Sequence, residues 1–132
     1  MSNVIPSDRA TTVSPSERSE SRNRSVPQYA QLDEYQNAAR RTINSALSEK
    51  DRLLDAAAGL AEESGEVLGL VRKHLMQNRD LDRDALTKEL GDVLWCLAVA
   101  ADTLDMKLSD IAVANEAKLR ARYPHGFPAA EL

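Results

Sequence analysis

The residues best suited to catalysis or metal binding lie in two short acidic stretches. They are GLAEESGEVLGL (59–70) and KELGDVLWCLAV (88–99), and each places a pair of carboxylates three residues apart, Glu63 with Glu66 and Glu89 with Asp92. Residues three or four apart share one face of a helix, and like charges at that spacing repel by about a few tenths of a kcal/mol. If they are partly buried, each unpaired ion costs about several kcal/mol. Each pair therefore needs a source of positive charge.

The neighbours of these acids on a helix supply little of that charge. Among the four, only Asp92 has a basic residue at helical spacing, Lys88, and the rest lie among Leu, Val, Ala, Gly and further acids. A single such Glu would usually be a solvated residue, or one paired with a distant arginine. Two pairs on apolar stripes favour a divalent cation, because Mg²⁺ and Mn²⁺ take oxygen ligands. Two antiparallel helices could bring both pairs to one cluster.

A di-iron site is the main rival metal centre. Di-iron helical bundles use a Glu-x-x-His motif on two helices, and neither acidic pair is followed by a histidine at that spacing. The two histidines are His74, two turns beyond Glu66, and His125 in the terminal turn. An all-carboxylate site instead suits Mg²⁺ acting on phosphate esters or anhydrides.

The elements that must position these acids are all predicted to be helices. Apolar spacing predicts helices at 32–48, 52–77, 84–105 and 110–123, with Asp82 and Ser109 as N-caps of the last two. The segment YPHGFP ends the fourth, because proline and glycine cannot continue a helix. Strand-like alternation is absent from the sequence. The expected fold is all-α, a four-helix bundle that is completed by oligomerisation.

Composition and charge limit the classes of partner. The 132 residues are enough for one domain, and the net charge of −4 argues against nucleic acid or an anionic membrane as partner. No apolar run reaches the length of a membrane span. The single cysteine, Cys96, lies in an apolar run, so we expect a buried thiol and a cytoplasmic protein.

The chain changes character near residue 28. Residues 1–27 are rich in Ser, Arg, Asn and Pro, and their formal charge is +1, from four arginines against three acids. We interpret this segment as a disordered, solvated tail, although its arginines could also contact a partner. Residues 28–132 are expected to form the functional domain.

The two acidic stretches resemble those of the MazG-like all-α nucleoside triphosphate pyrophosphohydrolases. The signature of that family is E-E-x-x-E, a spacer and E-x-x-D, which here reads Glu62-Glu63-Ser64-Gly65-Glu66 and Glu89-Leu90-Gly91-Asp92. LDEYQNAARRT (32–42) resembles the first helix of the family, and LSDIAVANEAKLRARYPHGF (108–127) resembles its last helix and closing turn. The short spacer is typical of a small single-domain member.

The resemblance implies a reaction and a set of roles. The family hydrolyses nucleoside triphosphates between the α and β phosphates with Mg²⁺ or Mn²⁺, through attack of a metal-activated water on the α-phosphorus. By position, Glu63, Glu66, Glu89 and Asp92 would hold the metal. Glu62 would orient or deprotonate the attacking water, or else be only a neighbouring surface acid.

Further residues are candidates for binding the substrate. Lys118 and Arg122 share a face of the last helix with Asn115, and the segment N-x-x-K-x-x-x-R-Y-P resembles the phosphate- and sugar-contacting segment of the family. These cations could also simply complement the helix dipole. Lys73 is a weaker candidate, and Trp95 could stack on a base or belong to the core. By resemblance alone, Tyr35 and Gln36 could line the base pocket.

The sequence thus predicts a nucleotide pyrophosphohydrolase that cleans up the nucleotide pool as a homodimer or homotetramer. The alternatives are a dUTP- or dCTP-specific pyrophosphatase of the same fold, and a helical interaction module that keeps the metal site but has lost turnover. The preferred base and sugar and the number of metal ions have no readable motif, because pocket shape decides them.

Overall fold

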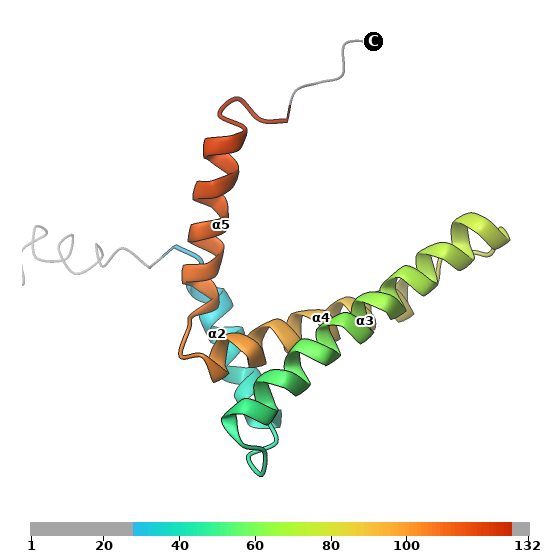
Figure 1. Ribbon diagram of the computed structural model, residues 1–132. Coiled ribbons are helices and arrows are strands. Elements are labelled where there is room, and N and C mark those ends of the chain that lie inside the picture. Colours follow the sequence, from blue (N-terminus) through green and yellow to red (C-terminus); the bar gives the residue numbers. More distant parts are fainter. Residues whose placement is uncertain (1–27, 128–132) are drawn as a thin grey trace, which may run out of the picture.

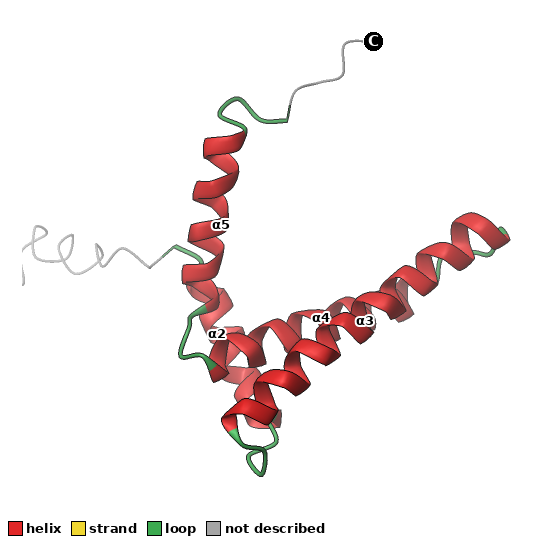
Figure 2. Ribbon diagram, viewed as in Figure 1, coloured by secondary structure: helices red, strands yellow, loops and turns green. Residues whose placement is uncertain are grey.

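The computed structural model describes residues 28–127, and regular structure in this range is helical apart from one isolated bridge between Pro124 and Gly126 (Figure 2). The helices are α2 (Ala30–Ala39), the 3₁₀ helix η1 (Arg40–Thr42), α3 (Glu49–Gln77), α4 (Arg83–Thr103) and α5 (Leu108–Arg122). The all-α class with four α-helices is confirmed. The predicted tail, 1–27, lies outside the described residues.

The four α-helices form an open V (Figure 1). α3 and α4 run side by side in opposite directions and make the most extensive helix–helix interface, which forms one arm. α2 packs on both α4 and α5 at the corner, and α5 extends away as the other arm. The single chain therefore holds the α3–α4 pair and α5 apart.

Two of the predicted helix boundaries are wrong. The first helix ends at Ala39 and η1 at Thr42, instead of continuing to Ser48. The side chain of Asn44 accepts a hydrogen bond from the N–H of Ala46 (3.0 Å), a local turn that competes with the helix. Ser48 is instead the N-cap of α3, where its Oγ accepts from the N–H of Asp51 (3.1 Å).

The predicted cap of α4 is confirmed, but that of α5 is not. The Asp82 carboxylate accepts from the N–H of Ala85 (2.9 Å) at the start of α4. α5 begins at Leu108 after Lys107, so Ser109 lies inside the helix. Its N–H and Oγ donate to the Asp33 carboxylate of α2, at 3.0 and 2.7 Å. A side chain from another helix thus takes the place of the local cap.

A core of small residues joins the three helices at the corner. The buried residues of this cluster are Ala39, Ala98, Ala101 and Leu108, with Leu32, Tyr35 and Trp95 packed against them. Small side chains let α2 and α4 approach closely, and the partly buried aromatic rings fill the remaining space.

A buried glutamine fixes the start of α5 on α2. Gln36 is 4% exposed, and its amide nitrogen donates to the carbonyl oxygen of Met106 (2.9 Å). Its amide oxygen accepts from the N–H of Leu108, also at 2.9 Å. Since both ends of this amide are hydrogen-bonded to residues at the start of α5, Gln36 ties α2 to the junction between α4 and α5.

Candidate metal centre

Three carboxylates meet on the α3–α4 arm. Glu63 of α3 and Glu89 and Asp92 of α4 each offer an oxygen atom, and these atoms all lie within 4.8 Å of one another. Glu63 and Glu89 are half-buried, and Asp92 is exposed. The i,i+3 spacing on α4 and the antiparallel packing of α3 produce this convergence, as the sequence suggested.

Two neighbouring acids of α3 stay outside this group. Glu66 is exposed and is not one of the three residues whose oxygens converge. It lies nearly one turn beyond Glu63 on the same face, so a side-chain rotation would be needed to bring it in. Glu62 is also exposed and lies beside Glu63 on the helix.

Within the part of the chain that the structure describes, no ion pair balances the negative charge of the cluster. Burial raises the pKa of Glu63, and the charges of Asp92 and Glu89 raise it further, with smaller contributions from Glu62 and Glu66. Within residues 28–127 the ion pairs are Arg40–Asp102 and Arg120–Glu116, and both lie outside the cluster. Lys88, the one basic neighbour expected from the sequence, forms no ion pair there.

The donor set fits a hard divalent cation. It consists of carboxylate oxygens from two facing helices, partly withdrawn from water, with uncompensated charge. These are the ligands that Mg²⁺ and Mn²⁺ prefer, and a bound cation would relieve the repulsion that raises the pKa of Glu63. Glu63, Glu89 and Asp92 are therefore the residues that would hold it.

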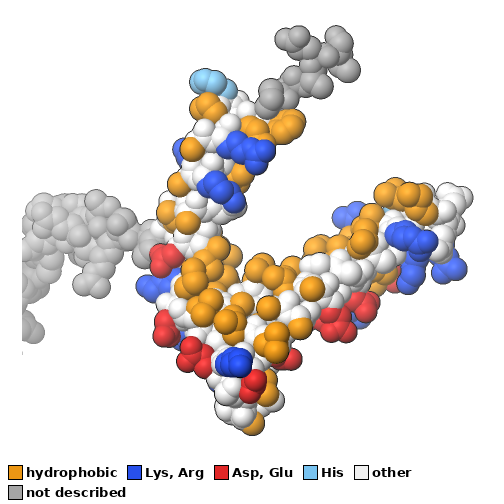
Figure 3. All heavy atoms as spheres, in the orientation of Figure 1, with side chains coloured by type: hydrophobic (Ala, Val, Ile, Leu, Met, Phe, Trp, Pro, Cys, Tyr) orange, Lys and Arg blue, Asp and Glu red, His pale blue; other side chains and the backbone are white. Residues whose placement is uncertain are grey.

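The predicted phosphate-binding residues lie on the other arm of the V. Asn115, Lys118 and Arg122 are exposed on α5. α5 packs mainly on α2, and its first residue, Leu108, also belongs to the corner cluster with residues of α4. Figure 3 shows acidic side chains midway along the α3–α4 arm and around the corner, and basic side chains on α5 and at the far end of the α3–α4 arm. Lys73 is exposed on α3, seven residues beyond Glu66. One chain thus does not bring the α5 cations to the acids.

Trp95 has at least one structural role. Its ring packs against the corner cluster, and its Nε1–H donates to Thr42 Oγ1 (2.8 Å). Tyr35 packs against the same cluster. Burial raises the pKa of its phenol, and the charges of Asp92 and Cys96 raise it further.

Gln36 and Cys96 belong to the framework around the site. The amide of Gln36 is bonded to the turn before α5, so this residue has a structural role, and its place in a base pocket stays a prediction. Cys96 is buried as expected, and burial followed by the charges of Glu63 and Asp92 raises the pKa of its thiol. The sequence spacing places Cys96 one helical turn from Asp92. It does not predict the close approach of Cys96 to α3.

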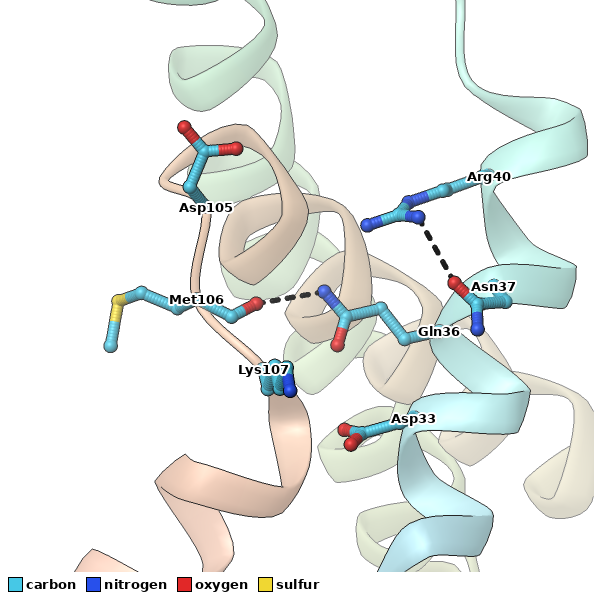
Figure 4. A pocket seen from close by; sticks show the side chains of 7 residues that line it. All are labelled: Asp33, Gln36, Asn37, Arg40, Asp105, Met106 and Lys107. Carbon is cyan, nitrogen blue, oxygen red and sulfur yellow. Dashed lines mark hydrogen bonds between the residues drawn. The ribbon is translucent and has the colours of Figure 1, made fainter.

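A polar pocket of about 360 Å³ lies beside the turn between α4 and α5, away from the three carboxylates. Figure 4 shows the seven side chains that line it: Asp33, Gln36, Asn37, Arg40, Asp105, Met106 and Lys107. Several of its polar groups already bond to one another, as in the contact of Arg40 with Asn37 (3.0 Å). The pocket therefore lies where α2 and η1 meet the turn between α4 and α5.

A known protein family matches more than half of the chain. Residues 53–127 match the model of the MazG nucleotide pyrophosphohydrolase domain, a segment that contains all five acids of the two motifs. Since the match covers more than half of the chain, the chain belongs to the MazG family. Its domain is of the nucleotide pyrophosphohydrolase type.

Two curated proteins are similar to the chain over 75 residues. The Gene 37 protein of Mycobacterium phage L5 is 41% identical, over 52% of this chain and 63% of that protein. The uncharacterized protein YvdC of Bacillus subtilis (strain 168) is 31% identical, over 50% of this chain and 71% of that protein. The matched segment thus spans under two thirds of the phage protein. No solved structure matches the chain.

Within residues 28–127, no helix combines the length and the apolar character that crossing a bilayer requires.

Proposed function

We propose that the protein is a Mg²⁺-dependent nucleotide pyrophosphohydrolase, which converts a (deoxy)nucleoside triphosphate to the monophosphate and pyrophosphate. The observation that carries this proposal is the convergence of Glu63, Glu89 and Asp92 within a MazG-family domain. Its role would be to remove surplus or non-canonical nucleotides in the cytoplasm. Mn²⁺ is expected to substitute for Mg²⁺, because it takes the same oxygen ligands.

The acids of α3 and α4 have two roles, binding the cation and orienting the attacking water. Glu63, Glu89 and Asp92 hold the cation, and Glu66 joins them by rotation of its side chain. When bound, Mg²⁺ neutralises phosphate oxygens and lowers the pKa of a coordinated water. Glu62, exposed beside the cluster, orients the water that attacks the α-phosphorus and accepts its proton.

The substrate is contacted by cations and an aromatic ring. Lys118 and Arg122 bind phosphate oxygens, Asn115 binds the sugar, and Lys73 contributes from the far end of α3. Charge stabilisation of this kind is the main task of protein groups in phosphoryl transfer. Trp95 contacts the base with the part of its ring that the corner core leaves exposed.

A homodimer or homotetramer is part of this proposal. α4 carries Leu90, Leu94 and Leu97 on one helical face, and these side chains are 50%, 37% and 42% exposed. Burying such a stripe against a second copy is favourable. A second copy could also bring α5 cations to the acids that α5 of the same chain does not contact.

The test is pyrophosphate release across a panel of ribo-, deoxy- and damaged nucleoside triphosphates, with Mg²⁺, Mn²⁺ or EDTA. We expect turnover with either metal, none with EDTA, and loss in Asp92→Asn and Glu66→Ala. Glu34→Gln, an exposed acid of α2, is the control and should behave as wild type.

The panel also distinguishes the alternatives. Turnover confined to dUTP or dCTP would narrow the substrate to one pyrimidine nucleotide. If no nucleotide of the panel releases pyrophosphate but Mg²⁺ still raises the melting temperature, catalysis is contradicted. The protein would then be a metal-binding interaction module.

A further inference from the structure

One glycine of α3 lies in close contact with α4. A Cβ atom added at Gly59 would meet Cys96 Sγ at 3.0 Å, which is closer than ordinary van der Waals contact. The other glycines of α3 and α4 are Gly65, Gly69 and Gly91, and a Cβ at any of them would meet nothing within 4 Å. Glycine is unfavourable inside a helix relative to alanine. Only at Gly59 does the neighbouring helix give a steric reason for it.

This contact lies one helical turn from the metal centre on both helices. Gly59 precedes Glu63 by four residues, and Cys96 follows Asp92 by four. Four residues are about 6 Å along a helix axis. Since α3 and α4 are antiparallel, the helix separation at Gly59 and Cys96 continues directly into the separation at Glu63 and Asp92.

The surroundings of the thiol leave it little room to yield. Cys96 is only 4% exposed. The neighbouring residue of α4, Trp95, is also held, by its packing on the corner cluster and by its 2.8 Å hydrogen bond to Thr42 of η1. Extra volume at residue 59 would therefore act mainly on the distance between α3 and α4.

We propose that Gly59 and Cys96 form a spacer that sets the separation of α3 and α4 at the metal centre. The spacer positions Glu63 against Asp92 so that one cation can be shared between the helices. Neither residue is a ligand, and their role is positional. This inference rests on the proposed function, because it concerns the same metal site.

The experiment is calorimetric titration of the full chain with MnCl₂, without nucleotide. Gly59→Ala should weaken Mn²⁺ binding by about tenfold or more, the loss typical when the support of a metal site is disturbed. Gly69→Ala is the matched control, a mid-helix glycine of α3 with free space, and should bind as wild type. Gly59→Ala with Cys96→Ala should recover wild-type affinity, because the sulfur atom that the new methyl group meets is gone.

The outcomes separate this inference from the function beneath it. Wild-type affinity in Gly59→Ala, or no recovery in the double variant, would overturn the spacer alone. No Mn²⁺ binding by the wild type would overturn the metal centre and the spacer with it. If circular dichroism shows that Gly59→Ala does not fold, Cys96→Val replaces it, since it enlarges the same contact from α4. A folded Cys96→Val with weakened binding supports the spacer, and wild-type binding overturns it.

Discussion

The pKa values of carboxylates shift in opposite directions in two regions of the molecule. One region is the contact between α2 and α5, called here the α2–α5 joint, and the other is the α3–α4 arm. At the joint, Asp33 accepts two hydrogen bonds from Ser109, and Glu116 accepts from Tyr29 (2.6 Å), Gln28 (2.8 Å) and Arg120. These bonds lower the pKa of both acids, chiefly through Ser109 for Asp33 and through Tyr29 for Glu116. On the α3–α4 arm, burial and neighbouring acids raise the pKa of Glu63.

The direction of the pKa shift distinguishes acids that stabilise the fold from acids that serve a ligand. An acid that the protein itself solvates with donors stabilises the fold in its charged form. An acid surrounded by other acids destabilises the fold until something else supplies positive charge. The predictions below test that division, beginning with the largest effect.

The first prediction compares one aspartate from each region. Asp92→Asn should reduce metal-dependent pyrophosphate release by about 100-fold or more, since changing even a residue that supports a metal ligand costs up to that much. Asp33→Asn should keep its turnover at temperatures well below its melting point. Equal loss in both variants would contradict the division, and steady-state kinetics at saturating Mg²⁺ measures it.

The second prediction concerns the joint alone. Gln36→Ala should lower the free energy of unfolding by about 1 to 3 kcal/mol, because it leaves the N–H of Leu108 buried without its acceptor. Gln31→Ala, exposed on the same helix, should change it by less than about 0.5 kcal/mol. Urea denaturation of the two variants measures both values, and similar small effects would show that Gln36 does not hold the joint.

The third prediction is a pH dependence of the metal-free protein. The folded-state pKa of Glu63 is raised, so its favourable contribution is complete below the ordinary value of 4.5 and is lost as the pH rises through the folded-state pKa. In EDTA at pH 7, Glu63→Gln should therefore have a higher melting temperature than wild type. This difference in melting temperature should vanish below pH 4.5. Thermal melts across this pH range measure it, and a difference that does not change with pH would contradict the prediction.

The fourth prediction is the same measurement with the opposite sign at the joint. The folded-state pKa of Asp33 is lowered, so its contribution is present above the ordinary value of 3.8 and is lost as the pH falls through the folded-state pKa. Asp33→Asn should lower the melting temperature at pH 7, and this cost should shrink at more acidic pH. A cost that stays constant with pH would indicate that the charge of Asp33 is irrelevant.

The smallest effect is expected at an exposed ion pair of the corner. Arg40 is 57% exposed, although its partner Asp102 is 15% exposed. Arg40→Gln should cost at most about 1 kcal/mol, and less in high salt, because solvent screens such pairs. Chemical denaturation at low and high NaCl measures this, and a large salt-independent cost would place the pair among the structural contacts.

Local patterns predicted part of the arrangement on the acidic arm, three of the four carboxylates expected to converge. The helical spacing of Glu89 and Asp92 placed both on one face, and antiparallel packing against α3 added Glu63. Asp82 was readable as a cap, because a cap is a contact between residues three apart. Such features depend on near neighbours in the sequence.

The remaining features depend on contacts between distant residues. Ser109 donates both of its hydrogen bonds to Asp33, 76 residues away in the sequence, so this contact could not be predicted from local sequence. The open V follows from how Gln36 and the small corner residues pack, which periodicity does not specify. Helical spacing likewise did not show that Glu66, on the same face of α3 as Glu63, lies outside the group of converging oxygen atoms.

The most direct test of the metal centre is the melting temperature of wild type and Glu63→Gln, each with EDTA and with Mg²⁺. The uncompensated charge at Glu63 predicts that the order reverses. Glu63→Gln should melt higher in EDTA, and wild type should melt higher in Mg²⁺, because only an intact site gains stability from the cation. If Mg²⁺ shifts both proteins equally, or shifts neither, the α3–α4 carboxylates are not a metal centre.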